Sequence, residues 1–190
     1  MGKLVGMLEF DIECTGLDRF KDHVTVASVY NPDVGIERNF NFCVGDVEGA
    51  KREFMQHLDD AEIICAFNGV RFDLPFIIQQ FGVPPQRWQL WFVKIFDYFE
   101  VCKTVFGSSC GLNKLLQANG EEVKTSSGLQ AVEWAKEGKW LDLEDYCMMD
   151  TKLTHKISMR GEVVLPLTGK AHMMRCYHDA MTHSLSFEAL

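Results

Sequence analysis

A short, wholly apolar run in the middle of the sequence most limits the architectures open to this 190-residue chain. Residues 63–67 read Ile-Ile-Cys-Ala-Phe, and Asn68-Gly69 ends the run with a turn signal. A strand without a polar face is typical of the interior of a sheet that is covered on both sides. The run therefore predicts a central strand with a layer of structure against each face.

Three segments with strand character come before this run. In the first, apolar residues at positions 8, 10 and 12 alternate with acidic residues at positions 9, 11 and 13, so each set occupies one face. Residues 24–30 and 36–43 predict two more strands, joined by the turn Asn31-Pro32-Asp33. The short connections predict antiparallel pairing among these three strands.

Helical periodicity dominates the rest of the sequence. Residues 46–58 place apolar side chains on one helical stripe, with Asp46 as the N-cap, and a second helix opens at Asp73. Further helices are predicted over the ranges 112–118, 128–136 and 141–157.

This order of elements predicts one α/β domain over residues 1–166. Its central sheet is expected to be mixed, antiparallel in the first three strands and parallel afterwards, with helices on its flanks. Residues 167–190 are expected to form a C-terminal tail or a docked helix.

The composition excludes several classes of protein. The 27 Asp and Glu residues against 19 Lys and Arg give a formal charge of −8, which argues against binding nucleic acid through bulk positive charge. It leaves open a protein that gathers carboxylates around metal ions. No apolar run approaches the roughly 20 residues of a membrane span, so no membrane association is expected. The seven cysteines are scattered and include no Cys-x-x-Cys pair, which predicts reduced thiols in a cytoplasmic or other reducing compartment.

The acidic face of the first strand is the strongest candidate for a functional site. Asp11 and Glu13 project from the same face, just before the turn Thr15-Gly16-Leu17. Roughly four such i,i+2 acidic pairs are expected by chance, so the spacing alone proves nothing. Two carboxylates at a poorly solvated strand end repel each other, and a bound Mg²⁺ or Mn²⁺ ion would relieve that repulsion. The alternative is a solvated strand end without a metal.

Two other segments carry acids at informative positions. Asp73 opens a helix after the segment Asn68-Gly-Val-Arg-Phe72, and helix capping is the alternative explanation for it. Tyr146 and Asp150 share one face of the long helix because they are four residues apart. The alternative for this pair is an ordinary amphipathic helix edge.

Together the three segments resemble the three motifs of the DEDD (DnaQ-like) 3′→5′ exonucleases, a family with a ribonuclease H-like fold. Phe10-Asp-Ile-Glu-Cys-Thr-Gly-Leu17 resembles the first motif, residues 68–73 the second, and residues 146–150 the tyrosine (DEDDy) form of the third. Position 145 is Asp, so the histidine form does not fit. The likeness covers residues 6–157, and the ranges 126–134 and 146–154 are similar to predicted exonucleases and helicase-associated ribonuclease H-like domains.

The resemblance implies hydrolysis of phosphodiester bonds with two Mg²⁺ or Mn²⁺ ions. It implies that Asp11 bridges both ions, that Glu13 and Asp150 complete one site, and that Asp73 holds the second ion. Tyr146 is expected to orient the attacking water, since a phenol with an ordinary pKa of about 10 is a poor base at neutral pH. The expected substrate is the 3′ end of single-stranded DNA or RNA, which would be released as nucleoside monophosphates.

Four residues near these motifs are weaker candidates for substrate contacts. Asn68 either forms a turn or binds a phosphate, and Phe72 either stacks on a terminal base or packs in the core. Lys124 and Ser126 either contact backbone phosphates or belong to a solvated loop. Glu9, on the acidic face of the first strand, is expected to be a structural ion-pair partner.

The main alternative function is a binding or scaffold subunit of a replication or RNA-processing assembly that keeps the fold without turnover. An endonuclease of the same fold is a third reading. The presence of all four acids and the tyrosine favours the exonuclease, because a scaffold has no reason to tolerate clustered acids. A polymerase, helicase or other assembly partner is expected to bind through the C-terminal tail. The sequence does not choose between DNA and RNA.

Overall fold

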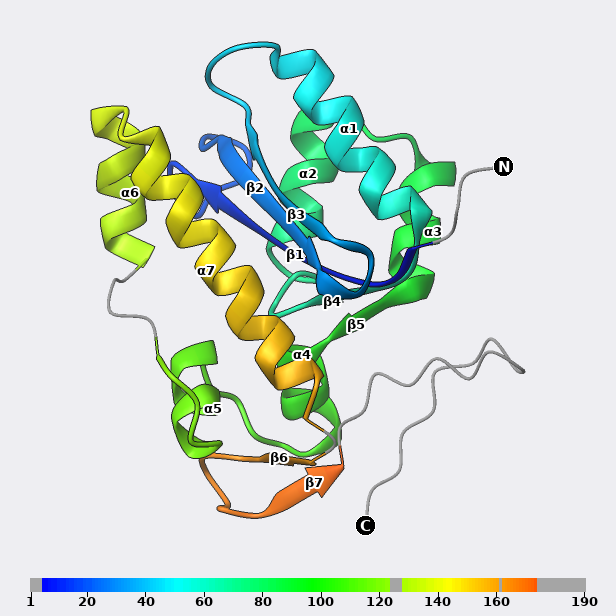
Figure 1. Ribbon diagram of the computed structural model, residues 1–190, viewed down its shortest axis with the longest axis vertical. Coiled ribbons are helices and arrows are strands. Elements are labelled where there is room, and N and C mark those ends of the chain that lie inside the picture. Colours follow the sequence, from blue (N-terminus) through cyan, green and yellow to red (C-terminus); the bar gives the residue numbers. More distant parts are fainter. Residues whose placement is uncertain (1–4, 124–127, 161, 174–190) are drawn as a thin grey trace.

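A five-stranded mixed sheet forms the centre of the protein (Figure 1). The computed structural model describes residues 5–123, 128–160 and 162–173. The strands lie in the order β3-β2-β1-β4-β5. Their bounds are β1 (Val5–Cys14), β2 (Val24–Asn31), β3 (Ile36–Asn41), β4 (Ala61–Ala66) and β5 (Ile95–Asp97).

The pairing of the strands confirms the predicted mixed sheet. β2 pairs antiparallel with both β1 and β3, whereas β4 pairs parallel with β1 and β5. β4 lies between β1 and β5, and its side chains at Ile64 and Cys65 are fully buried, as its apolar sequence predicts. The mixed α/β architecture that the sequence predicts is therefore present.

Helices cover both faces of the sheet (Figure 1). One face carries α1 (Val47–Asp60), α2 (Asp73–Phe81) and α3 (Pro85–Lys94). The other face carries α5 (Leu112–Ala118), α6 (Gly128–Glu137) and α7 (Trp140–Ser158). Short elements complete the chain: η1 (Pro32–Val34), α4 (Tyr98–Glu100), the π-helical turn η2 (Val101–Val105), and a hairpin of β6 (Glu162–Val164) and β7 (Ala171–Met173).

The alternation along β1 decides what faces each layer. Its apolar residues Leu8, Phe10 and Ile12 belong to the core beneath α1 to α3. Because successive side chains of a strand point to opposite faces, its acidic residues face α7 on the other side. The same strand therefore contributes apolar side chains to the main core and acidic side chains to the opposite face.

Aromatic rings fill the core between α1 and the sheet. Phe54 of α1 is fully buried and makes ring contacts with Phe10, Phe40, Phe42 and Phe81, at centroid distances from 5.5 to 6.5 Å. Aromatic pairs in tilted or edge-on geometry stabilise a core beyond their buried area. This cluster holds the first helical layer against β1 and β3.

Local hydrogen bonds explain where two predicted elements begin and end. Asp46 caps α1 as predicted, since its Oδ1 accepts the N–H of Gly49 at 2.9 Å. β3 ends two residues before its predicted limit because the side chain of Asn41 accepts the N–H groups of Cys43 and Val44. Those two bonds turn the chain out of the sheet.

The periphery carries two features outside the predicted pattern. The proposed domain boundary after residue 166 falls within the hairpin of β6 and β7.

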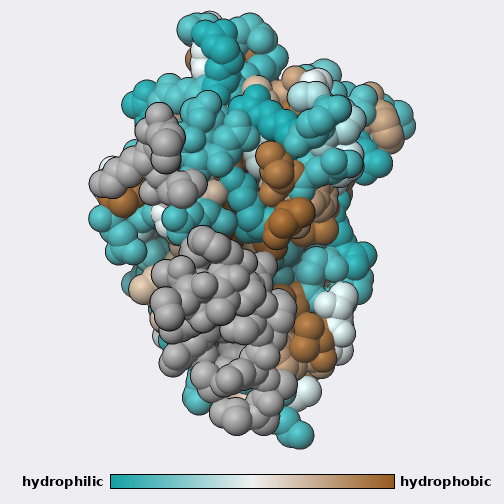
Figure 2. Space-filling view, turned by 90° about the vertical axis from the view of Figure 1, so that its right-hand side faces the viewer, coloured by the Kyte–Doolittle hydropathy of each residue, from teal (hydrophilic) through white to brown (hydrophobic). Residues whose placement is uncertain are grey.

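Helix α3 carries exposed apolar side chains, since Leu90 and Val93 are 63% and 77% exposed. Figure 2 views the side of the molecule on which α3 lies in Figure 1. It shows apolar side chains interrupting a mostly hydrophilic surface. Within the described ranges, no helix has both the length and the apolar character that crossing a membrane requires.

Truncation of Phe54 tests the aromatic core. Phe54→Ala is expected to lower the free energy of unfolding by about 3–5 kcal/mol, because the buried ring would leave a cavity among four other rings. Urea denaturation followed by circular dichroism measures the change. The control is Arg52→Ala on the exposed side of the same helix, expected to stay within about 0.5 kcal/mol. Equal effects of the two substitutions would contradict this account of the core.

Candidate metal centre

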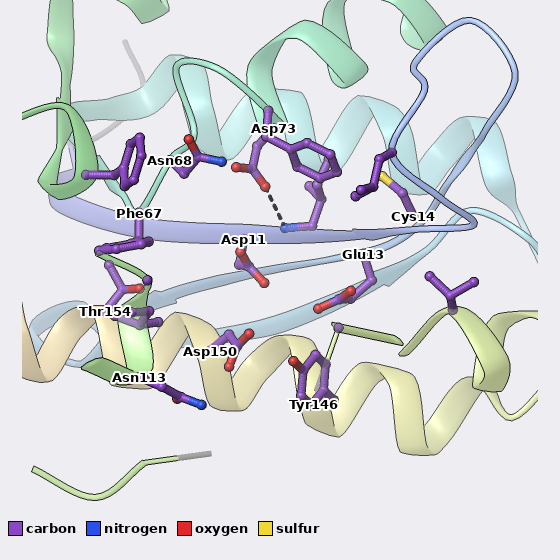
Figure 3. Close-up of a pocket in the computed structure, with 18 of the residues that line it drawn as sticks. Asp11, Glu13, Cys14, Phe67, Asn68, Asp73, Asn113, Tyr146, Asp150 and Thr154 are labelled. Atoms are coloured by element: carbon purple, nitrogen blue, oxygen red, sulfur yellow. Dashed lines mark hydrogen bonds between the residues drawn. The ribbon is translucent and has the colours of Figure 1, made fainter. Parts of the chain in front are cut away.

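A cleft of about 900 Å³ opens where β1, the turn after β4, and helices α5 to α7 meet (Figure 3). All five residues that the sequence analysis assigned to the chemistry line it: Asp11, Glu13, Asp73, Tyr146 and Asp150. They come from three segments that are far apart in the sequence. The structure therefore brings the three motifs into one site.

Three carboxylates form the tightest acidic group. Asp11 and Glu13 leave the same face of β1, and Asp150 reaches toward them from α7. One carboxylate oxygen from each lies within 4.8 Å of the others. Like charges at that separation repel, and a divalent cation between them would turn the repulsion into attraction. The donors are all oxygens, which suits Mg²⁺ or Mn²⁺ better than softer metals.

Asp73 stands beside this group, on the far side of β1. It is the first residue of α2, and its Oδ1 accepts the backbone N–H of Ile12 at 3.3 Å (Figure 3). The helix-capping alternative does not describe it, because Phe72 is the N-cap and makes no side-chain cap bond. Burial, together with the charges of Asp97 and Asp150, raises the pKa of Asp73 to about 7, although backbone hydrogen bonds such as that from Ile12 oppose the rise. The fold therefore holds this carboxyl close to the other acids at an energetic cost.

α7 presents a ladder of polar side chains to the cleft. Tyr146, Asp150 and Thr154 all line the cleft and are spaced by four residues, so they lie one above another on the same helix face. Tyr146 is 3% exposed, and its ring makes an edge-on contact with Trp134 of α6 at 5.9 Å between centroids. This packing fixes the direction in which the phenol points.

Cys147 links α7 to β1 beside the acids, a role that the sequence did not predict. Its thiol is fully buried and donates to the backbone oxygen of Asp11 at 3.4 Å, with the Asp11 Oδ2 at 3.7 Å. Burial raises the pKa of this thiol well above its ordinary value, so it stays a neutral donor. Only the approach of residues 136 positions apart creates this role, and no local pattern marks it.

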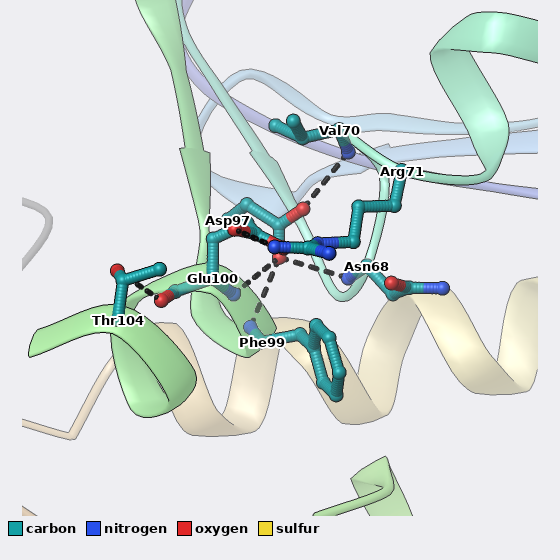
Figure 4. A network of polar contacts seen from close by, with 7 residues as sticks. All are labelled: Asn68, Val70, Arg71, Asp97, Phe99, Glu100 and Thr104. Atoms are coloured by element: carbon teal, nitrogen blue, oxygen red, sulfur yellow. Dashed lines mark hydrogen bonds and ion pairs between the residues drawn. The ribbon is translucent and has the colours of Figure 1, made fainter. Parts of the chain in front are cut away.

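A second missed residue is Asp97, at the end of β5. Its carboxylate is 4% exposed and accepts four backbone N–H groups (Figure 4). Two of the donors are Asn68 at 2.9 Å and Val70 at 2.8 Å, in the turn that leads to Asp73. The other two, Phe99 at 2.9 Å and Glu100 at 3.2 Å, belong to α4. Burial raises the pKa of Asp97 and the four donors oppose that rise, so Asp97 anchors the turn to the neighbouring strand.

The turn at Asn68 is constrained by shape as well. Asn68 has a positive φ of 71°, a conformation that Asn tolerates better than most residues. At Gly69, a Cβ atom would lie 2.6 Å from the Cβ of Ala66, so only glycine fits. Both alternatives for Asn68 remain compatible with its place, since its backbone forms the turn and its side chain lines the cleft.

The remaining candidates have different outcomes. Phe72 lines the cleft and also packs on Phe76 at 4.8 Å between centroids. Its ring therefore packs against the core, and stacking on a base stays a prediction. Glu9 is fully buried, and its Oε1 accepts the Ser158 hydroxyl at 2.7 Å and lies 3.0 Å from the His155 Nδ1, as expected of a structural partner. Lys124 and Ser126 lie outside the described residues.

Replacement of Asp73 tests how much stability the protein loses when this buried carboxyl ionises. Its folded pKa of about 7 exceeds its ordinary value of 3.8, so the folded protein binds a proton that the unfolded chain releases between those pH values. Stability of the metal-free protein therefore falls as pH rises through this window. Asp73→Asn removes this loss and is expected to raise Tm at pH 8 but to change it little at pH 4. Thermal unfolding in EDTA measures both, and an equal shift at the two pH values would disprove the account.

Truncation of Asp97 tests the anchor of the turn. Asp97→Ala leaves four N–H groups without their acceptor and is expected to cost about 3–5 kcal/mol in the free energy of unfolding. Glu100→Gln is the matched control, because the pair that Glu100 forms with Arg71 is exposed and is expected to contribute less than about 1 kcal/mol. Chemical denaturation compares the two. A loss below 1 kcal/mol in Asp97→Ala would show that the turn holds without it.

Two comparisons relate the chain to known proteins. A family model of the RNase H superfamily matches residues 8–159. The fold is also similar to that of the family B DNA polymerase from the hyperthermophilic archaeon Pyrobaculum calidifontis, with a TM-score of 0.60 and 20% identity. The match covers 80% of this chain and only 24% of that chain, and at this identity it shows the fold alone. No curated protein sequence matches this one. Since the family model spans most of the sequence, the chain belongs to the RNase H superfamily.

Proposed function

We propose that the protein is a metal-dependent 3′→5′ exonuclease that acts on single-stranded DNA or RNA and releases nucleoside 5′-monophosphates. The observation that carries the proposal is the convergence of Asp11, Glu13 and Asp150 to within 4.8 Å, in a cleft that Asp73 and Tyr146 also line. A cleft of about 900 Å³ has the size of sites that hold nucleotide-sized ligands.

The four acids are assigned to two divalent cations, Mg²⁺ or Mn²⁺. Asp11, Glu13 and Asp150 would hold one ion, and Asp11 with Asp73 would hold the second, directly or through water. When bound, such ions make a hydroxide available near neutral pH and stabilise the negative charge on a leaving oxygen. Oxygen-only donors and clustered like charge both fit this role.

The proposed reaction is a hydrolysis with in-line geometry. The attacking water releases a proton to solvent as its oxygen bonds to the phosphorus of the terminal nucleotide. The bond from phosphorus to the preceding 3′-oxygen breaks, and that oxygen takes up a proton from solvent. Tyr146 orients the attacking water from the Glu13 side of the cleft, where Figure 3 shows its phenol beside that carboxylate. Its role is positioning, because a phenol with a pKa of about 10 is a poor base at neutral pH.

The charge of the chain limits how it meets nucleic acid. Because the formal charge is −8, the metal-free protein binds a phosphate backbone weakly. Binding of the substrate's 3′ end therefore depends on the metal ions that the acids hold. The likeness to a family B DNA polymerase supports a link to nucleic-acid metabolism. We also propose that the C-terminal tail binds a polymerase, a helicase or another assembly partner. The protein is proposed to work in a reducing compartment. A silent scaffold subunit of the same fold is the second candidate.

Hydrolysis of a 5′-labelled single strand tests the proposal. The wild-type protein is expected to give a descending ladder with Mg²⁺ or Mn²⁺ and no products in EDTA. Asp11→Ala and Asp150→Asn are expected to lose at least about 10³-fold in rate, while Tyr146→Phe keeps a few per cent, about 1–10%, because it removes positioning only. Asp145→Asn, an exposed acid on the same helix, is the control and is expected to match wild type.

Each other outcome has a definite meaning. Full activity of Asp11→Ala, on material shown free of contaminating nuclease, would contradict the assignment of the acids to the metal ions. Products from the middle of the strand would identify an endonuclease instead. No products from DNA or RNA with either metal would establish the scaffold reading.

A further inference from the structure

A second hollow, of about 310 Å³, adjoins the cleft beside α2. Its walls are the loop that joins β1 to β2 and the first residues of α2, whose Asp73 lies across β1 from α7 in Figure 3. Leu17 and Phe72 line both the cleft and this hollow, so the two spaces share a border. We call the second space the Phe20 hollow; its lining residues lie in the ranges 17–20, 71–72 and 75–76.

The two spaces differ in the charges that line them. Four acids line the cleft, and no Lys or Arg of the described residues does. The Phe20 hollow is lined by Arg19, Arg71 and a single acid, Asp18. Asp18 lies 3.0 Å from the ammonium of Lys21, and Arg71 is paired with Glu100, whereas Arg19 has no ion-pair partner within the described part of the chain. Arg19 therefore presents an uncompensated positive charge next to the acidic cleft.

Arg19 and Phe20 together form an exposed flat surface. The Phe20 side chain is 70% exposed, and the guanidinium carbon of Arg19 lies 4.9 Å from the centroid of its ring. Aromatic rings and guanidinium planes are the surfaces on which unpaired bases stack. A guanidinium also binds backbone phosphates through charge-assisted hydrogen bonds. The pair therefore has the chemistry of a binding surface for single-stranded nucleic acid.

Hydrogen bonds fix the loop that carries this surface. The Oδ2 of Asp22 accepts the backbone N–H of Asp18 at 2.8 Å, and the backbone oxygen of Asp18 accepts the N–H groups of Lys21 and Asp22 at 2.8 and 2.7 Å. Gln80 of α2 donates to the backbone oxygen of Asp22 at 2.6 Å and accepts the N–H of Val24 at 2.8 Å. A surface that is ordered before binding loses less conformational entropy when a ligand arrives.

We propose that the Phe20 hollow binds nucleotides of the single strand that lie upstream of those in the cleft. The inference rests on the proposed function, which places the 3′ end at the acids. A strand held there by its 3′ end leaves the cleft with its upstream nucleotides, and the border at Leu17 and Phe72 leads into the hollow. A base stacks on the surface of Arg19 and Phe20, and a backbone phosphate pairs with the Arg19 guanidinium.

A comparison of strand lengths tests the proposal. The probes are a single-stranded DNA 2-mer, the shortest strand with a scissile bond, and an 8-mer. Phe20→Ala and Arg19→Gln are each expected to lower kcat/KM about ten-fold on the 8-mer and less than about two-fold on the 2-mer, because only the 8-mer extends well beyond the cleft. Damage to the fold or to the acids would lower both values alike.

Lys21→Gln is the matched control. Lys21 belongs to the same loop and carries the same charge as Arg19, but its side chain is 82% exposed and does not line the hollow. The variant is expected to stay within about two-fold of wild type on both strands. A general loss of positive charge would instead affect Arg19→Gln and Lys21→Gln equally.

A binding measurement does not depend on turnover. Fluorescence anisotropy of a labelled 8-mer reports its Kd for the inactive Asp150→Asn protein in Mg²⁺. Adding Phe20→Ala or Arg19→Gln to that protein is expected to raise Kd about ten-fold, and adding Lys21→Gln is expected to change it less than about two-fold.

The results separate this inference from the proposed function. If the protein is an exonuclease but Phe20→Ala lowers cleavage of the two strands equally or not at all, the hollow is not a strand-binding site. An equal loss in Lys21→Gln would also overturn the assignment. If the protein cleaves nothing, the proposed function fails and the anisotropy decides: a Kd that rises with Phe20→Ala and Arg19→Gln alone supports the hollow, and an unchanged Kd overturns it.

Discussion

The docking of α7 on the acidic face of β1 is the constraint on which the rest of the structure depends. A strand face with three acids gains nothing from contact with a helix unless each carboxylate finds a partner there. One carboxylate oxygen of Glu9 accepts the Ser158 hydroxyl and lies beside His155, and the thiol of Cys147 donates to the backbone oxygen of Asp11. These contacts align the two elements closely enough for Asp150 to join the acids of β1.

This alignment brings together carboxylates whose negative charges repel one another. The burial of Asp73 beside the same group, and the rise of its pKa to about 7, show that the fold holds carboxyl groups where they are costly to ionise. The aromatic core under α1 and the turn anchored by Asp97 stabilise the fold and offset the destabilisation from these carboxyl groups. Such a conflict between local stability and geometry is typical of sites that work through bound ions.

The sequence predicted the parts of the molecule that follow local rules. The alternation of β1, the apolar run in β4 and the four-residue spacing of Tyr146 and Asp150 each reflect one element's own periodicity. The three-residue strand β5 is too short to show a pattern, and the sequence of helix α3 has no clear helical periodicity, so neither was predicted. The roles of Asp97 and Cys147 come from contacts between distant segments, which periodicity cannot reveal.

The ladder of Tyr146, Asp150 and Thr154 also limits how a protein of this kind can change over evolution. One residue inserted between two of its members would rotate everything beyond it by about 100° around the helix axis and carry half of the ladder out of the cleft. The length of α7 in this stretch is therefore fixed as strictly as its three side chains.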